Sequence, residues 1–368
     1  MAKFDPGSTT SAAQAGTRQL GAWGRGALFS FATVGMLAIG HANAQPAGSG
    51  GPITLERFGS FHVGGRLVEL SGRPVREYLP TVGSAPLRID PNGVHIVGAM
   101  YARFMVPAPQ RGTAPLMLWH GAYLTGVTWE TTPDGREGWD AFFLRRGWAT
   151  YVTDAVERGR SGAAMVPEIY APPLHLPMQN PWERFRIGDG PGSQARGTVL
   201  PGNQFPAEPE NYLSFMRQVV PRYLDTDEDV LAAYVALLER VGPSVVIAHS
   251  QGGAFAWQVA QRRPDLFRAL VLVEPAGTGA IAEAARLKDV PQLLVYGDYV
   301  DADPRWSVIR TSARRFAAAI REAGGRIEDV DLPSRGIHGN SHMLMMDRNS
   351  DVVAGLVQDW LATQGLWR

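Results

Sequence analysis

The chain has 368 residues, of which 45% are hydrophobic and 19% charged, which is typical of a folded globular protein with room for one large domain and an insertion. Lys and Arg together number 35, as do Asp and Glu, so no net field favours nucleic acid or an anionic membrane surface. The absence of cysteine excludes disulfides, thiol nucleophiles and cysteine-ligated metals.

The first 44 residues have the pattern of an export signal. Three basic residues precede an apolar run, 27–40, and 42–44 has the small-x-small pattern of a cleavage site. The run is shorter than the roughly 20 residues that span a bilayer. We expect cleavage after Ala44 and a periplasmic or secreted protein with no stable membrane insertion, the alternative being that the leader stays as an anchor.

Strand and helix patterns follow the leader. Residues 45–52 form a Gly/Pro/Ala linker, and short alternating segments over 53–105 predict antiparallel strands. Apolar strand runs then alternate with helical patterns, which predicts parallel βα units. The predicted core strands are 115–119, 148–153, 245–248, 269–273, 292–296 and 326–332. The predicted helices include 138–146, 227–241, 254–263 and 351–363. The sequence therefore predicts an α/β fold with a mostly parallel, doubly wound sheet of about eight strands, built from 53–160 and 227–368.

The segment 161–226 interrupts this alternation and is dense in proline and glycine. A structureless loop of this length is uncommon in a compact domain. We interpret it as a cap inserted over an active site. The candidate walls of a substrate pocket are its aromatic and methionine side chains Tyr170, Met178, Trp182, Phe185 and Phe205. The alternative is that these aromatic residues only anchor an irregular surface segment.

The segment 244–253 carries the most specific motif of the chain, an apolar strand that breaks into small-His-Ser-Gln-Gly and then a helical pattern. A serine raised on such a strand-to-helix turn needs small residues two positions before and after it, and Ala248 and Gly252 meet that need. The turn leaves the Gln251 N–H at a helix N-terminus, where an oxyanion would form. We predict that Ser250 is a nucleophile and Gln251 an oxyanion donor; a purely structural turn is the alternative.

A serine nucleophile needs a histidine base, which a carboxylate holds in the correct tautomer. Downstream of Ser250 only His338 and His342 remain, both on the loop after the last predicted strand. The spacing of the two histidines favours His342 over His338 as the base only slightly.

Three acidic residues follow core strands and are candidates for the orienting carboxylate. The usual position after the later strand favours Asp298 or Asp301. Glu274 instead comes directly off a wholly apolar strand, where a carboxylate needs a partner to offset its desolvation. A triad histidine would be such a partner, and the residues alone leave the choice open.

The second oxyanion donor is expected on the loop that follows the strand ending at Trp119. There His120-Gly121-Ala122 places a small, flexible backbone at the carboxyl edge of the sheet, and we assign the donor N–H to Ala122. His120 and His249 flank this machinery, and we expect both to be structural hydrogen-bonding residues.

With these residues placed, the chain resembles the α/β-hydrolase fold and, more closely, a small group of bacterial esterases that includes enzymes de-esterifying sulfonylurea herbicides. The segments that carry the resemblance are His120-Gly121, 124–126, 129–136, Gly159-Arg160, His249-Ser250, Glu274-Pro275, 339–342 and 347–349. The resemblance implies a triad of Ser250, Glu274 and His342, with no cofactor and no metal. Some members carry two adjacent cysteines where this chain has Ala122-Tyr123, so we expect a different loop rigidity and a pocket narrowed by Tyr123.

We therefore expect a serine carboxylesterase that hydrolyses small to medium esters through an acyl-enzyme on Ser250. The alternatives are an amidase or lactonase with the same triad, and a catalytically idle ligand-binding protein. The expected partner is a small-molecule ester, with no nucleic acid, and self-association as a homodimer is left open.

Overall fold

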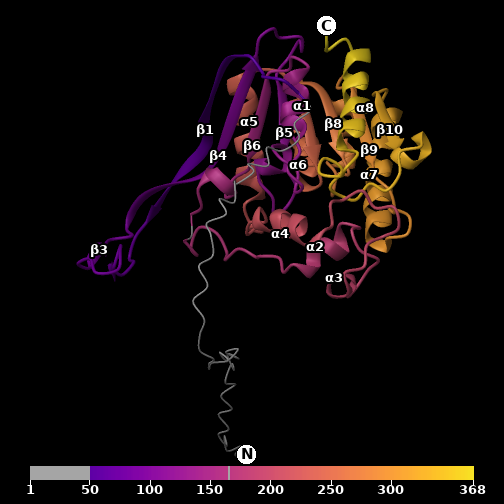
Figure 1. Cartoon of the computed structure of the whole chain (residues 1–368). Coiled ribbons are helices and arrows are strands. Elements are labelled where there is room, and N and C mark those ends of the chain that lie inside the picture. The colour runs from indigo at the N-terminus through magenta and orange to yellow at the C-terminus, as the bar shows by residue number, and fades with distance from the viewer. Residues whose placement is uncertain (1–49, 165) are drawn as a thin grey trace, which may run out of the picture. The chain divides into compact units, whose positions relative to one another are not determined.

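The computed structural model describes residues 50–164 and 166–368 (Figure 1). The predicted leader, 1–44, and most of the linker, 45–52, lie outside the described residues. Within the described ranges, none of the helices has the length and hydropathy needed to cross a bilayer.

An eight-stranded sheet forms the centre of the domain (Figure 1). Its spatial order is β1-β4-β6-β5-β7-β8-β9-β10, with antiparallel pairing of β1 with β4 and of β4 with β6, and parallel pairing from β6 to β10. The strands are β1 (Leu55–Leu70), β4 (Gly93–Pro107), β5 (Leu116–Trp119), β6 (Thr150–Asp154), β7 (Ser244–His249), β8 (Phe267–Val273), β9 (Gln292–Tyr296) and β10 (Ile327–Asp331). The predicted mostly parallel sheet of about eight strands is confirmed.

Helices cover both faces of this sheet, and alternate strand residues contact opposite faces. In β7, Val246 and Ala248 pack in one apolar cluster with α5, α6 and α7, whereas Val245 and Ile247 pack in a second cluster with α1 and α8. Because helices exclude solvent from both faces of the sheet, the core strands are continuous apolar runs. The helices are α1 (Trp139–Arg145), α5 (Asp227–Val241), α6 (Gln251–Arg262), α7 (Pro304–Glu322) and α8 (Ser350–Thr363). Short 3-10 turns connect the elements: η1 (Gly126–Trp129), η2 (Gly159–Ser161), η3 (Pro264–Leu266), η4 (Ile281–Leu287) and η5 (Leu332–Arg335).

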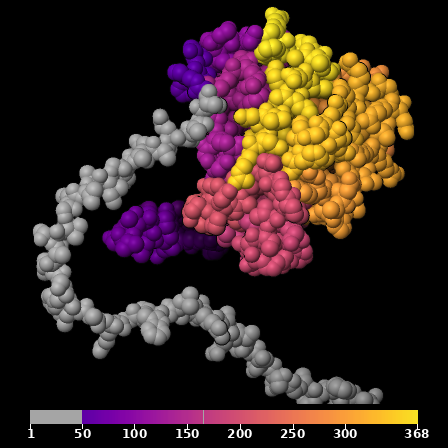
Figure 2. All heavy atoms as spheres, turned by 45° about the vertical axis from the view of Figure 1, so that its right-hand side comes forward, coloured from indigo at the N-terminus to yellow at the C-terminus, as the bar shows by residue number. Residues whose placement is uncertain are grey.

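The segment predicted as a cap contains three short helices between η2 and α5 (Figure 1). They are α2 (Gln179–Arg184), α3 (Ser193–Arg196) and α4 (Pro209–Arg217). In the space-filling view, these rose-coloured residues form a lobe against the core (Figure 2). Aromatic rings hold the lobe together: Trp182 and Tyr212 have centroids 4.7 Å apart, and Phe205 and Phe215 lie 5.4 Å apart. These rings belong to the same apolar cluster as α1, α8 and one face of the sheet, so the lobe packs onto the main core.

A two-stranded hairpin of β2 (Arg76–Tyr78) and β3 (Leu87–Ile89) extends from the end of the β1–β4 ribbon (Figure 1). Several apolar side chains of the hairpin and the adjoining ribbon are exposed, among them Leu67, Val75, Leu79, Val82, Val94 and Ile96. None of these residues lines the cavity beside Ser250.

Candidate active site

Ser250 lies on a sharp turn between β7 and α6. Its φ of 54° and ψ of −119° are strained values for a residue with a side chain. Two hydrogen bonds fix the turn: the Ser250 N–H donates to Val273 O at 3.0 Å, and the Ser250 carbonyl accepts from Ala276 N at 2.9 Å. A Cβ on Gly252 would lie 2.6 Å from the His120 carbonyl oxygen, so a side chain at that position cannot be accommodated. The requirement for a small residue two positions after the serine therefore has a direct steric cause.

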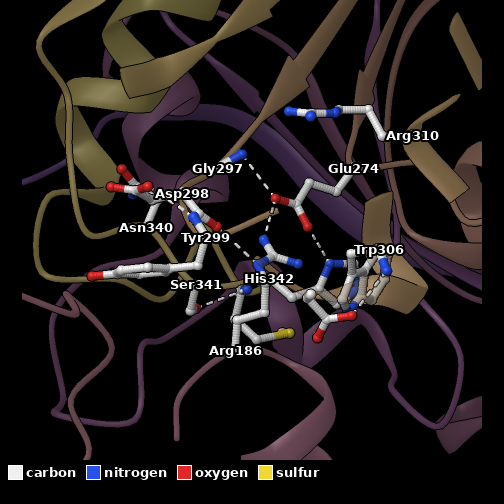
Figure 3. Close-up of polar contacts among 12 residues, drawn as sticks. Arg186, Glu274, Gly297, Asp298, Tyr299, Trp306, Arg310, Asn340, Ser341 and His342 are labelled. Atoms are coloured by element: carbon white, nitrogen blue, oxygen red, sulfur yellow. Dashed lines mark hydrogen bonds and ion pairs between the residues drawn. The ribbon is translucent and has the colours of Figure 1, made fainter. Parts of the chain in front are cut away.

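His342 and Glu274 form a hydrogen-bonded pair from which water is excluded (Figure 3). His342 Nδ1 lies 2.6 Å from Glu274 Oε2, and neither side chain is exposed. Because a carboxylate can only accept a hydrogen bond, the proton of the neutral imidazole lies on Nδ1 and Nε2 is the basic nitrogen. His342 Nε2 is buried and has no hydrogen-bond partner among the described residues.

The His342 ring is held beside the turn that carries Ser250. His249, which precedes the serine, donates from Nε2 to the His342 carbonyl oxygen at 2.9 Å, and the two imidazole centroids lie 4.5 Å apart. Trp306 and Phe185 pack on the His342 ring with centroid distances of 3.9 and 5.0 Å. These contacts hold the buried His342 ring against the turn that carries Ser250.

Glu274 has partners on both carboxylate oxygens (Figure 3). Its Oε1 accepts from Arg186 Nη2 at 2.5 Å and from the Gly297 N–H at 2.8 Å, while Oε2 accepts from His342. Burial opposes ionisation of this carboxyl, but the Arg186 charge and the His342 hydrogen bond outweigh burial and hold the pKa of Glu274 at about 2. The carboxylate is therefore ionised and can orient the imidazole.

Arg186 belongs to the cap and was not identified from the sequence. Its side chain is almost fully buried, and its Nε donates to the Asp298 carbonyl oxygen at 2.9 Å. Its φ of 57° is also unusual for a residue with a side chain. An isolated arginine in an irregular segment has no spacing that marks it as a partner of a distant glutamate.

The other candidates for base and acid lie elsewhere. Asp298 Oδ2 accepts from the Gly339 N–H at 2.9 Å and lies 3.6 Å from the exposed His338 ring. Asp301 forms an ion pair with Arg310. The structure thus brings His342 to Glu274, and neither aspartate contacts His342.

A buried carboxyl shapes the loop that carries His342. Asp347 accepts from Ser341 N at 2.9 Å, from Ser341 Oγ at 2.7 Å and from Asn340 Nδ2 at 3.1 Å. Burial raises the pKa of Asp347 to about 7 despite these donors. The Asn-Ser-His run is therefore built around Asp347, which fixes the backbone on either side of the imidazole.

The two predicted oxyanion donors line the same cavity as Ser250. Gln251 is the first residue of α6, so its N–H has no partner within the helix, and neither its N–H nor that of Ala122 donates to another described residue. The Ala122 loop passes close to the serine, because a Cβ on Gly121 would lie 3.0 Å from Ser250 Cβ. His120 anchors the loop: its Nε2 accepts from Ala155 N at 3.0 Å and its Nδ1 donates to Gly121 O at 2.8 Å.

A cavity of about 390 Å³ opens beside Ser250. Tyr123 and Phe185 line it, as the sequence predicts, and so does Trp306, which sequence reasoning missed. The prediction for Trp182 and Phe205 is wrong: both rings are buried in the apolar core beneath the cap and do not line the cavity. Within the described residues, no group of three or more His, Asp or Glu side chains is arranged to hold a metal ion.

The chain matches the α/β hydrolase fold family over residues 114–326. It is 34% identical to a bacterial esterase of known structure, with a TM-score of 0.75, over 87% of this chain and 99% of that chain. It is 27% identical to a protein of a fungal species (strain ATCC 74256) named probable secreted lipase phiG, over 73% of this chain and 88% of the relative. It is 32% identical to lipase LipV of Mycobacterium tuberculosis over 32% of this chain and 40% of that lipase.

These similarities agree with the strand order and with a serine raised on a strained turn after β7. The family match and the bacterial structure each extend over more than half of the described residues. The chain belongs to the α/β-hydrolase fold family.

Proposed function

We propose that this protein is a serine carboxylesterase that hydrolyses small carboxylic esters. The observation that carries the proposal is the buried His342–Glu274 pair at 2.6 Å, with a free imidazole nitrogen beside the strained turn of Ser250. The names of the relatives, an esterase and two lipases, support an ester as the substrate.

In the proposed reaction, Ser250 Oγ attacks the ester carbonyl carbon while His342 Nε2 accepts its proton. The Ala122 and Gln251 N–H groups donate to the resulting oxyanion, and loss of one such donor costs about 3 kcal/mol of barrier. Collapse breaks the bond to the alcohol, which takes the proton from His342. Water, deprotonated by the same imidazole, then hydrolyses the acyl-enzyme, while Glu274 stabilises the imidazolium in both steps.

The proposal is tested with p-nitrophenyl acetate and butyrate and with a fluorophosphonate probe. We expect turnover of both esters and a covalent label on the Ser250 peptide. Glu274→Gln is expected to lower kcat by as much as about 10⁴-fold, because the neutral amide no longer stabilises the imidazolium. The matched variant Asp298→Asn is expected to keep wild-type turnover, since the Asp298 carboxylate accepts from the Gly339 and Tyr299 N–H groups and forms no hydrogen bond with His342.

Two results would contradict the proposal. If Asp298→Asn loses activity and Glu274→Gln keeps it, the carboxylate that orients His342 would be Asp298, which follows β9, and not Glu274. A protein that neither hydrolyses these esters nor reacts with the probe would be a binding protein, and faster cleavage of matched amides or lactones would make it an amidase or lactonase.

The pH profile is expected to show an unusually acidic base. Burial lowers the pKa of His342 to about 4, although Glu274 acts in the opposite direction. A lowered pKa keeps the imidazole neutral and able to accept a proton until the pH falls to that value. We therefore expect kcat/KM to stay level from about pH 8 to about pH 5 and to fall near pH 4. An acid limb centred near pH 6.5, the usual pKa of histidine, would contradict this prediction. Samples returned from acid to neutral pH should recover full activity, which excludes acid unfolding as the cause of the loss.

A further inference from the structure

Three arginines line the cavity beside Ser250: Arg184 at the end of α2, Arg222 before α5, and Arg305 at the start of α7. Asp227 is the one carboxylate among the residues that line this cavity. None of the three arginines forms an ion pair within the described part of the chain, whereas the nearby cap residue Arg196 pairs with Asp189 at 3.0 Å. The cavity thus has excess positive charge that the protein itself does not neutralise.

Arg184 and Arg305 lie on the side of the cavity next to His342. Trp306, which stacks on His342, donates from its indole nitrogen to the Arg184 carbonyl oxygen at 2.5 Å, and Arg305 is the adjacent residue. Arg305 also stands in the first turn of α7, where the helix dipole disfavours a cation. Burial and the neighbouring Arg184 charge both lower the pKa of Arg305. This placement is unfavourable in the free protein and becomes favourable when an anion binds.

Arg222 lies against Gln251, the residue that follows the nucleophile. In the amide orientation that satisfies both groups, the Gln251 side-chain oxygen accepts from Arg222 Nε at 3.2 Å and from Nη2 at 2.6 Å. Two backbone hydrogen bonds with Leu174, of 2.9 and 2.8 Å, fix the Arg222 backbone. The buried Arg158, whose Nη1 atom has no partner among the described residues, lines a smaller neighbouring cavity together with Gln251. The cavity beside Ser250 therefore has one guanidinium against Gln251 and two more next to Trp306.

We propose that the ester substrate carries a carboxylate and that Arg184, Arg222 and Arg305 bind it. This inference rests on the proposed esterase function and narrows its substrate class to half esters of dicarboxylic acids or hydroxy acids acylated on the hydroxyl group, both of which keep a free carboxylate. A guanidinium binds a carboxylate through charge-assisted hydrogen bonds, which are stronger than those between neutral groups. At about 390 Å³ the cavity is at the small end for ligand sites, which suits a short substrate.

Two isosteric pairs of substrates test the proposal in the full chain. Monoethyl adipate and ethyl adipamate differ only in a carboxylate or carboxamide on the acyl half; 4-acetoxybutanoate and 4-acetoxybutanamide differ in the same way on the alcohol half. We expect kcat/KM for the anion to exceed that for the amide at least tenfold in one pair, equivalent to about 1.4 kcal/mol. The preferred pair shows which half of the ester carries the charge, and the preference should weaken in 0.5 M NaCl because ions screen partly exposed charges.

Variants identify the residues that cause the preference. Arg222→Gln and the double variant Arg184→Gln/Arg305→Gln are each expected to reduce the anion-to-amide ratio by at least threefold, and the triple variant to abolish it. The exposed Arg335, on η5 and outside the cavity lining, provides a matched control, and Arg335→Gln is expected to keep the wild-type ratio. The ratio is independent of the concentration of active enzyme, so partial misfolding of a variant does not change it.

The outcomes separate this inference from the function on which it rests. If the protein hydrolyses p-nitrophenyl acetate but prefers the anion in neither pair, or if the preference survives in the triple variant, the carboxylate site is wrong and the esterase stands. If p-nitrophenyl acetate is not hydrolysed and Ser250 is not labelled, the esterase function fails and this inference fails with it.

Discussion

Ser250→Ala is expected to lower kcat for p-nitrophenyl esters by roughly 10⁴- to 10⁶-fold, the range seen when a triad nucleophile is removed. The variant retains the Ala122 and Gln251 donors and the cavity, so some acceleration over water should remain. The fold should be intact, because the Ser250 side chain forms no hydrogen bond with another described residue and its backbone is held by Val273 and Ala276.

The controls for this experiment separate chemistry from folding. Ser334→Ala, on the η5 turn outside the cavity lining, is expected to keep wild-type turnover. The thermal midpoint of Ser250→Ala should lie within a few degrees of wild type, and the variant should not react with the fluorophosphonate probe. Turnover by Ser250→Ala within tenfold of wild type would reject Ser250 as the nucleophile.

Arg186→Met is expected to lower the free energy of unfolding by about 3–5 kcal/mol, because it leaves the Glu274 carboxylate buried without its cationic partner. The Arg186–Glu274 contact is 2.5 Å long and fully removed from solvent, so water cannot replace the lost guanidinium. Turnover is expected to fall as well, since Arg186 joins the cap to the acid that orients His342. Denaturant unfolding and ester kinetics measure the two effects.

A double-variant cycle with Glu274→Gln isolates the ion pair from other consequences of the change. Arg186→Met/Glu274→Gln contains neither buried charge, so it should be more stable than Arg186→Met alone. Arg196→Met, which removes an exposed cap ion pair, is the matched control and should change stability by less than about 1 kcal/mol.

The pH profile separates a positioning role for Arg186 from a merely structural one. The Arg186 charge lowers the pKa of His342, so removing that charge should move the acid limb of kcat/KM upward from near pH 4. Arg186→Lys should restore part of both stability and turnover. A destabilised Arg186→Met variant with an unmoved acid limb would mean that Arg186 supports the fold without acting on the base.

Local pattern was sufficient for the sheet and for the serine. The core strands are buried on both faces, so their apolar runs are visible in the sequence, and the small residues around Ser250 are required by the turn itself. The resemblance to known esterases, and not spacing, selected Glu274 and His342 from the acids and histidines that the residues left open.

Only the tertiary structure decided what surrounds these groups. Trp182 and Phe205 were expected in the pocket wall, but both pack in the apolar cluster shared with α1, α8 and the sheet. No periodicity in a proline-rich segment distinguishes the two roles. Arg186 and Glu274 are 88 positions apart and meet because the segment 161–226 packs Arg186 against the residue that follows β8. Long-range contacts between single residues have no local signal. The sequence therefore determined the scaffold and the turn that carries Ser250, while the structure determined the partners of the side chains around that turn.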